Sequence, residues 1–311
     1  MRLLMTPQTS SYRMKSPRLS VFFEITDNCN FHCNFCCKTW HGSYSSPCSR
    51  SELSLEDIDK ILRIPKDWGK ISGGEPAKCK NKVFYYLRRE TARKSINTNL
   101  SLWTPQEVTS LCELVDDMTI NIPSLDAGIH SHITTSTSSE LNNILTCLPY
   151  VDTNKAKIAL VVTEDNLQDV HTSLLRFAAD YGFTQFLLSP RIPNGKSTLD
   201  FLQALNSIQA ISEQHANLNI ATVGPIRGCT VKGSHVCDAG LHRLVVLVNR
   251  NVVPCAWNNA HILGTLDDDL SVLLQRGKDY WESYEPQQRL YCKGYIENEK
   301  IYGEPGTGTQ V

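Results

Sequence analysis

Apolar runs of strand length alternate with amphipathic segments of helical length along most of the chain. They predict strands at 19–25, 69–72, 94–98, 117–122, 156–162 and 184–189, and helices at 54–64, 80–92, 104–114, 138–148 and 166–181. A crossover helix returns the chain to the same edge of a sheet, so strands that alternate with helices pair in parallel. The pattern therefore restricts the fold to the α/β class, with a parallel sheet covered by helices.

Three closely spaced cysteines follow the first predicted strand, in the segment Cys29-Asn-Phe-His-Cys33-Asn-Phe-Cys36. A structural metal site normally has four protein ligands, whereas three thiolates leave one metal position open for an exchangeable ligand. The loop is therefore a candidate catalytic metal centre. A zinc site and a set of buried free cysteines are the alternatives, because cysteine is often buried without binding a metal.

A short strand that ends in two glycines and a carboxylate comes next, in Lys70-Ile-Ser-Gly73-Gly74-Glu75-Pro76. Glycines let a backbone approach a ligand closely, and a glutamate at a strand end can accept hydrogen bonds from an ammonium group. Such a segment is also a common turn. Its position after the cysteine loop favours a role in binding a ligand.

Together, the cysteine loop and the Gly-Gly-Glu-Pro segment resemble those of the radical S-adenosylmethionine (SAM) enzymes, including the aromatic Phe35 before the third cysteine. The resemblance implies a partial (β/α)6 barrel. It implies that Cys29, Cys33 and Cys36 bind a 4Fe–4S cluster whose fourth iron binds SAM. The residues that would hold the amino group of SAM are Gly73, Gly74, Glu75 and Pro76.

In that family an electron, which we expect from a flavodoxin or ferredoxin type of donor, enters the cluster and breaks SAM into methionine and a 5′-deoxyadenosyl radical. The radical then removes a hydrogen atom from the substrate. The resemblance therefore implies the same hydrogen abstraction for this chain.

Polar residues follow the later strands, at the ends where ligands of parallel sheets gather. The resemblance implies SAM contacts at Asn97, Asn99, Ser124, Asp126 and Arg191. Ser124 and Asp126 would bind the ribose hydroxyls, and Asn97 or Asn99 the methionine part. Arg191 would pair with a carboxylate through its planar guanidinium. Asparagine, serine and aspartate are also common turn residues, so structural roles remain open.

The last part of the chain departs from the barrel pattern. Segment 237–255 predicts a β-hairpin that turns at Asn249-Arg250-Asn251, and a helix follows near 269–281. The segment resembles the auxiliary-cluster region called SPASM or, in its shorter form, Twitch. Arg250 replaces the glycine expected in that hairpin, and no Cys-x2-Cys follows Cys255. We therefore expect the shorter, single-cluster form.

Four cysteines accompany this region, namely Cys229, Cys237, Cys255 and Cys292. The resemblance implies a second, auxiliary 4Fe–4S cluster held by Cys237, Cys255 and Cys292, with Cys229 as a fourth ligand. The alternative is a group of unligated cysteines. Twelve cysteines in a cytosolic chain indicate cluster ligands and buried thiols, whereas in a secreted chain they would indicate disulfides.

We divide the chain into a mobile N-terminus at 1–17, a barrel at 18–220, an auxiliary iron–sulfur region at 221–302 and a disordered tail at 303–311. With 311 residues and 41% hydrophobic content, it can bury a barrel-sized core and a small appendage. It has no apolar run long enough to span a membrane and no signal sequence, so we expect a cytoplasmic protein. A net charge of −1 argues against a nucleic-acid partner.

The auxiliary-cluster class contains many peptide modifiers, which favours maturation of a ribosomally made natural-product peptide by oxidation, crosslinking or epimerisation. The alternative substrate is an aminoglycoside-like or other small molecule, dehydrogenated or epimerised. A non-catalytic iron–sulfur carrier or scaffold is a hypothesis of another class. An epimerase of this kind needs a thiol that returns a hydrogen atom. Cys37, directly after the cluster loop, is the candidate donor, with a buried structural thiol as the alternative.

Overall fold

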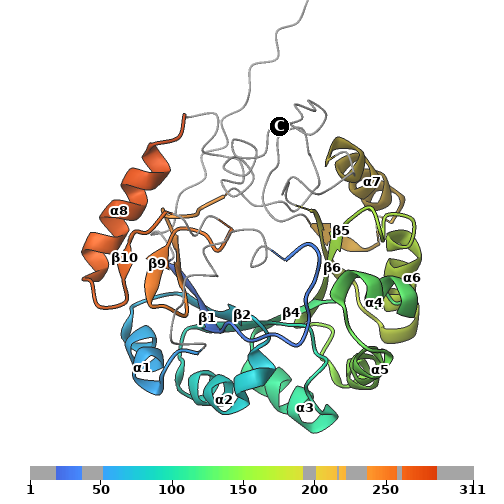
Figure 1. Cartoon of the computed structure of the whole chain (residues 1–311), viewed down its shortest axis with the longest axis horizontal. Coiled ribbons are helices and arrows are strands. Elements are labelled where there is room, and N and C mark those ends of the chain that lie inside the picture. Colours follow the sequence, from blue (N-terminus) through green and yellow to red (C-terminus); the bar gives the residue numbers. More distant parts are fainter. Residues whose placement is uncertain are drawn as a thin grey trace, which may run out of the picture.

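The computed structural model describes residues 19–36, 52–191, 201–215, 217–221, 237–257 and 261–285. The strands in these ranges form one sheet in the order β10-β9-β8-β1-β2-β3-β4-β5-β6-β7. The sheet curves around an interior, and helices α1 to α7 lie outside it (Figure 1). Strands β1 to β8 are parallel, and only β9 and β10 continue the sheet in antiparallel pairs. The predicted α/β class with a parallel sheet is confirmed.

The strands are β1 (Ser20–Thr26), β2 (Trp68–Gly73), β3 (Arg93–Thr98), β4 (Asp117–Asn121), β5 (Ala156–Val162), β6 (Gln185–Pro190), β7 (Asn219–Ala221), β8 (Arg243–Val246), β9 (Asn251–Val253) and β10 (Gly264–Thr265). The α-helices are α1 (Leu55–Arg63), α2 (Lys80–Arg89), α3 (Pro105–Leu114), α4 (Ala127–Thr134), α5 (Ser138–Cys147), α6 (Val170–Tyr181), α7 (Phe201–Gln214) and α8 (Leu270–Glu282). The 3₁₀ turns within the described residues are η3 (Pro76–Cys79) and η4 (Leu148–Tyr150).

All six strands predicted in the barrel occur, as do its five predicted helices and the helix near 269–281. The helices α4 and α7 and the strand β7 were not predicted. The predicted terminal segments 1–17 and 303–311 lie outside the described residues. In the part of the chain that is described, no helix is both long enough and apolar enough to cross a membrane.

One face of the sheet lies against the outer helices, and the other lines the barrel interior. A Cβ atom at Gly69 would lie 1.8 Å from the hydroxyl of Tyr86 in α2, so Gly69 faces the helices. Because side chains alternate along a strand, Trp68, Lys70 and Ser72 face the barrel interior.

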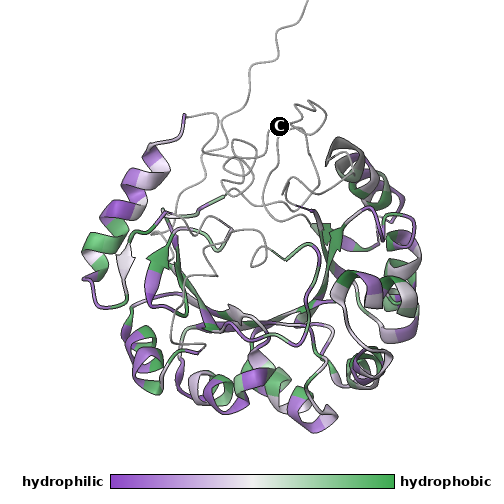
Figure 2. Ribbon diagram, in the orientation of Figure 1, coloured by the Kyte–Doolittle hydropathy of each residue, from purple (hydrophilic) through white to green (hydrophobic). Residues whose placement is uncertain are grey.

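The outer face of the sheet packs against the helices to form the main hydrophobic core. Its fully buried residues include Phe23, Ile71, Ile96, Ile120 and Ile158, one from each of the strands β1 to β5. Hydrophobic and hydrophilic residues alternate along the outer helices, as expected when one side of a helix packs on a sheet (Figure 2). The core thus holds the strand ends in place around the interior.

The C-terminal hairpin extends the barrel sheet, because β8 pairs in parallel with β1. Its turn closes with a hydrogen bond of 2.9 Å from the Arg250 N–H to the carbonyl of Leu247. Arg250 has a φ of 72°, a left-handed conformation that glycine adopts more readily. Its guanidinium lies 3.0 Å from Asp57 and 2.6 Å from Asp267. These ion pairs join the hairpin to α1 and offset the strain of an arginine at this position.

Candidate functional site

The cysteine loop and the Gly-Gly-Glu-Pro segment lie side by side at the carboxyl ends of β1 and β2. The Gly74 N–H donates to the Thr26 carbonyl at 2.6 Å, and the Glu75 N–H donates to the Asn28 carbonyl at 2.8 Å. A Cβ atom at Gly73 would lie 2.3 Å from the Thr26 oxygen, and one at Gly74 would lie 2.2 Å from the Asn28 oxygen. Both glycines are therefore needed for the two backbones to approach each other.

The three cysteines of the loop are all partly buried. The Cys36 N–H donates to the Cys33 carbonyl at 3.0 Å, which folds the last two cysteines into one turn. Burial first, and then the charges of Cys36 and Cys29, raise the pKa of Cys33 well above its usual range. Thiolates grouped in this way repel one another, and a bound metal centre relieves that repulsion.

A single zinc ion and an iron–sulfur cluster make different demands on the loop. A tetrahedral zinc ion needs every sulfur at about 2.3 Å from one point, whereas the cysteines of an iron–sulfur cluster bind separate irons. In the described ranges, no three His, Cys, Asp or Glu side chains are arranged to hold one ion. A zinc site stays the alternative to the cluster.

Asn30 connects the cysteine loop to the neighbouring part of the barrel. Its side-chain NH₂ donates to Ser101 Oγ at 2.8 Å and to Glu140 Oε1 at 2.7 Å, and its Oδ1 accepts from Asn99 Nδ2 at 3.1 Å. Asn99 is buried, and its own Oδ1 accepts from the hydroxyl of Ser101 at 2.7 Å. The predicted SAM contact Asn99 thus lies within hydrogen-bonding distance of the loop.

Arg191, at the end of β6, holds the far side of the loop. Its Nη2 donates to the Asn34 carbonyl at 2.8 Å, and its Nη1 lies 3.3 Å from Glu164. The Asn34 side chain in turn donates to Asp165 at 2.8 Å. The structure therefore gives Arg191 a positioning role, and its predicted contact with a carboxylate of SAM or of the substrate stays a prediction.

Glu75 is buried, and both of its carboxylate oxygens accept hydrogen bonds from the chain. Oε1 accepts from Thr98 Oγ1 at 2.6 Å and from the Ala77 N–H at 3.0 Å, and Oε2 accepts from the Asn99 N–H at 2.7 Å. Burial raises the pKa of Glu75 despite the opposing effect of these hydrogen bonds. The carboxylate thus connects the end of β2 to the end of β3, a contact that the sequence did not predict.

Ser124 and Asp126 have structural partners in the loop between β4 and α4. The fully buried Ser124 donates to Asp169 Oδ2 at 2.6 Å and accepts from the Asp126 N–H at 2.9 Å. Asp126 Oδ1 accepts from the Ile129 N–H at 2.9 Å, which makes Asp126 the N-cap of α4. The structural roles that the sequence left open are therefore present, and the contacts with the SAM ribose stay predictions.

Two buried oxygens on neighbouring strands fit a polar ligand. Asn97 and Thr119 are paired residues of β3 and β4, and they face the interior because Ser95 pairs with the inward-facing Lys70. In the described part of the chain, Asn97 Oδ1 and Thr119 Oγ1 have no hydrogen-bond partner. Leaving such an atom buried without a partner costs about 1–3 kcal/mol. Asn97 is therefore a predicted SAM contact that has a polar atom to offer.

The predicted auxiliary ligands are only partly described. Cys229 and Cys292 lie outside the described residues, as does the candidate hydrogen donor Cys37. Cys237 is buried before β8, and Cys255 is partly buried after β9. A Cβ atom at Gly240 would lie 3.3 Å from the Pro254 Cβ, so the chain segments that carry the two cysteines approach each other.

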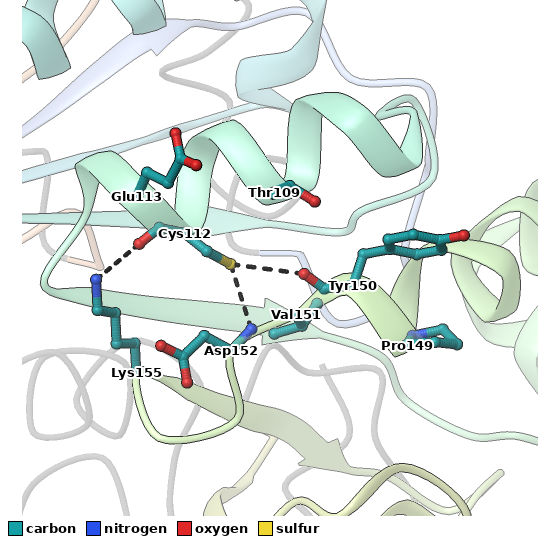
Figure 3. A pocket seen from close by; sticks show the side chains of 8 residues that line it. All are labelled: Thr109, Cys112, Glu113, Pro149, Tyr150, Val151, Asp152 and Lys155. Carbon is teal, nitrogen blue, oxygen red and sulfur yellow. Dashed lines mark hydrogen bonds between the residues drawn. The ribbon is translucent and has the colours of Figure 1, made fainter.

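A separate pocket of about 370 Å³ lies between α3 and the segment that leads into β5 (Figure 3). The N–H of Asp152 donates to Cys112 Sγ at 3.3 Å, and Lys155 Nζ donates to the Cys112 carbonyl at 2.7 Å. Burial raises the pKa of Cys112. This pocket lies at the amino ends of β4 and β5, whereas the cysteine loop lies at the carboxyl ends of the strands, so Cys112 belongs to a different part of the molecule.

No family model matches the chain. A segment of 64 residues is 39% identical to a probable GTP 3′,8-cyclase of Methanothermobacter thermautotrophicus, and the alignment spans 19% of each protein. Streptococcus suis SuiB bound to SAM superimposes with a TM-score of 0.62 at 16% identity, covering 92% of this chain and 68% of SuiB. The enzyme anSMEcpe with bound SAM and the Kp18Cys peptide superimposes with a TM-score of 0.66 at 15% identity. The match covers 93% of this chain and 97% of anSMEcpe.

SuiB and anSMEcpe are radical SAM enzymes. This chain has the radical SAM fold. The radical SAM fold accounts for the position of the cysteine loop, since β1 and β2 are adjacent parallel strands and both motifs follow their carboxyl ends. Sequence reasoning missed Asn30 and Glu140, which have no motif of their own and meet only in the folded chain.

Proposed function

We propose that the chain is a radical SAM enzyme in which Cys29, Cys33 and Cys36 bind a 4Fe–4S cluster and leave one iron for SAM. The proposal rests on the cysteine loop, which two backbone hydrogen bonds join to the Gly-Gly-Glu-Pro segment. When bound, the cluster and SAM supply a 5′-deoxyadenosyl radical that removes a hydrogen atom from the substrate.

The chain's own residues hold the loop and the cofactor in place. Asn30 and Arg191 fix the loop from opposite sides, through Glu140 and through the backbone of Asn34. Phe35 lies between the second and third cysteines, where its ring would exclude water from the cluster. Asn97 would donate to or accept from a polar group of SAM inside the barrel.

We infer that the substrate is a ribosomally made peptide, which the enzyme matures by oxidation, crosslinking or epimerisation. SuiB has been solved bound to its precursor peptide SuiA, and anSMEcpe with a bound peptide. Both superimpose on more than nine tenths of this chain, with 92% and 93% coverage. This likeness supports a peptide substrate.

The test of the enzymatic function is anaerobic incubation of the reconstituted protein with SAM and dithionite, which replaces the expected flavodoxin or ferredoxin. We expect 5′-deoxyadenosine from the wild type and none from Cys33→Ala. Cys112→Ala is the matched control, because its thiol lies at the amino ends of the strands and should not alter product formation. A wild-type protein that holds its iron yet yields no 5′-deoxyadenosine would support the carrier hypothesis instead.

We also propose an auxiliary 4Fe–4S cluster bound by Cys237 and Cys255 together with Cys229 and Cys292. The measurement is iron and sulfide per chain in the wild type and in the triple variant with Cys29, Cys33 and Cys36 changed to alanine. Two four-iron clusters require about eight irons falling to about four. A wild type with about four irons and a triple variant with none would contradict the auxiliary cluster.

A further inference from the structure

Lys70 is a buried lysine of β2 whose side chain faces the barrel interior. It is 9% exposed, and it precedes Gly73 of the ligand-binding segment on the same strand. In the described part of the chain, its ammonium has no carboxylate or carbonyl within hydrogen-bonding or ion-pairing distance. An ammonium group donates three hydrogen bonds and is rarely buried without a partner.

Two aromatic rings are the contacts that the Lys70 ammonium does make. Its Nζ lies 5.4 Å from the centre of the Phe22 ring and 5.8 Å from that of Trp68. Each ring also faces a second cation on its own, since Arg243 lies 5.2 Å from Phe22 and Arg93 lies 5.1 Å from Trp68. The rings attract cations only weakly, and their faces cannot replace a carboxylate or carbonyl oxygen as hydrogen-bond acceptors.

The charges around Lys70 are already paired with one another. Asp117 forms ion pairs with Lys157 at 2.8 Å and with Arg93 at 3.9 Å. Arg243 pairs with Asp238. Three of the charged groups that act on the Lys70 ammonium are therefore cations, and one, Asp117, is a carboxylate. Lys70 is the most buried of the four cations.

These effects together lower the pKa of Lys70 to about 7. Burial contributes most, the cations Lys157, Arg243 and Arg93 act in the same direction, and Asp117 opposes them. An anion beside the ammonium would raise the pKa again, because it stabilises the charged form. A ligand that brings a negative charge to this position would therefore bind favourably, because it stabilises the charged form of Lys70.

We propose that Lys70 binds an oxyanion of the substrate, a carboxylate or a phosphate group, inside the barrel. The proposal deepens the enzymatic function and rests on it, because it assigns this position to the substrate. Thr119 lies two residues nearer the carboxyl end of β4 than the residue level with Lys70, and its Oγ1, which has no partner among the described residues, would bind the adjoining polar part of the substrate. The substrate is thereby anchored by its charge below the strand ends that carry the cysteine loop.

The test measures binding to the anaerobically reconstituted protein by calorimetry, without SAM or reductant. N-acetyl-L-glutamate is the carboxylate probe and inorganic phosphate the phosphate probe, both titrated at constant ionic strength below pH 7. We expect one of the two to bind the wild type, and whichever binds identifies the oxyanion. Lys70→Met should weaken that binding at least tenfold, whereas Lys70→Arg should retain it.

Lys94→Met is the matched control, because Lys94 lies on the adjacent strand and donates to the Leu87 carbonyl in α2. It should bind the probe as the wild type does. Equal weakening by Lys70→Met and Lys94→Met, or no binding of either anion to the wild type, would overturn the proposal. If Lys70→Met does not fold, ¹⁵N-lysine NMR of the wild type decides, with the Lys70 signal assigned from its absence in Lys70→Arg. We expect that signal to shift when the anion is added. An unchanged signal would overturn the proposal.

The binding test is independent of the enzymatic one. A protein that binds the anion but makes no 5′-deoxyadenosine would contradict the radical SAM activity and retain the oxyanion site. A protein that makes 5′-deoxyadenosine but binds neither probe would retain the radical SAM activity and contradict the oxyanion site.

Discussion

The carboxyl end of the sheet and the barrel interior around Lys70 differ in how far their polar side chains are hydrogen-bonded within the protein. Around the cysteine loop, the side chains of Asn30, Glu75 and Arg191 reach across to neighbouring segments and form hydrogen bonds within the chain. In the interior, the Lys70 ammonium lies against two aromatic rings, and Asn97 Oδ1 is buried without a partner in the described part of the chain. The first region is organised before any ligand arrives, whereas the second leaves its polar groups for a ligand to satisfy.

The largest effect is expected from Gly74→Ala. Its Cβ would lie 2.2 Å from the Asn28 carbonyl, so the cysteine loop must move away from the Gly-Gly-Glu-Pro segment. Displacement of a reacting centre by about 1 Å can lower a rate about a hundredfold. We expect that loss in 5′-deoxyadenosine formation, with reduced iron content.

Gly128→Ala is the control for this substitution, because the nearest atom to its Cβ is a side-chain oxygen of Asp126 at 3.3 Å. It should retain iron and activity. Full iron content and activity in Gly74→Ala would show that the loop is not preorganised, and would remove one side of the comparison.

Lys70→Met tests the other side through the pH dependence of stability. The unfolded lysine binds its proton up to about pH 10.4, but the folded one only up to about pH 7. Between these values the unfolded state holds more protons, so the free energy of unfolding rises with pH. Replacing a buried ion with an apolar side chain should stabilise the fold at pH 6 by about 1–4 kcal/mol.

Urea denaturation at pH 6, 7 and 8 measures this effect. The wild type should become more stable relative to Lys70→Met as the pH rises above 7. A constant difference between the two proteins would mean that Lys70 is not a buried cation, and would contradict the contrast drawn above.

Asn30→Ala should have a smaller effect, because it removes hydrogen bonds, one of them to the Glu140 carboxylate, but no charged group. It leaves Glu140 and Asn99 without a partner that each now has, at a cost of about 1–3 kcal/mol in the free energy of unfolding. Asn154→Ala, in an exposed turn, should change it by less than about 0.5 kcal/mol. Equal values from chemical denaturation of the two variants would show that the Asn30 contacts do not stabilise the loop.

The smallest effect is expected from Arg250→Gly, which acts in the hairpin outside both regions. Glycine removes the strain of the left-handed backbone, which costs a non-glycine residue about 1–3 kcal/mol. The substitution also removes the ion pairs with Asp57 and Asp267. We expect a net loss of about 1 kcal/mol, since these two effects oppose each other and Asp57 is buried. A thermal melt in which Arg250→Gly is more stable than the wild type would show that strain outweighs the ion pairs.

The sequence by itself determined the order of strands and helices in the barrel and the adjacency of its two motifs. Apolar periodicity is local, and crossover helices bring successive parallel strands together, so the end of β1 had to lie beside the end of β2. The helix α4 was missed because Gly128 and β-branched residues weaken its local signal, while Asp126 caps it and the cysteine loop bonds to its last turn.

Only the tertiary structure decided which polar side chains are paired. Asn30 meets Glu140 across 110 residues of sequence, and β8 joins the free side of β1, contacts that no local pattern encodes. Likewise, the sequence places Lys70 in a strand but does not show which groups surround it. In the described part of the chain its ammonium has no counter-ion, because Lys70 is buried and Asp117 pairs with other cations, and both depend on which strands lie side by side.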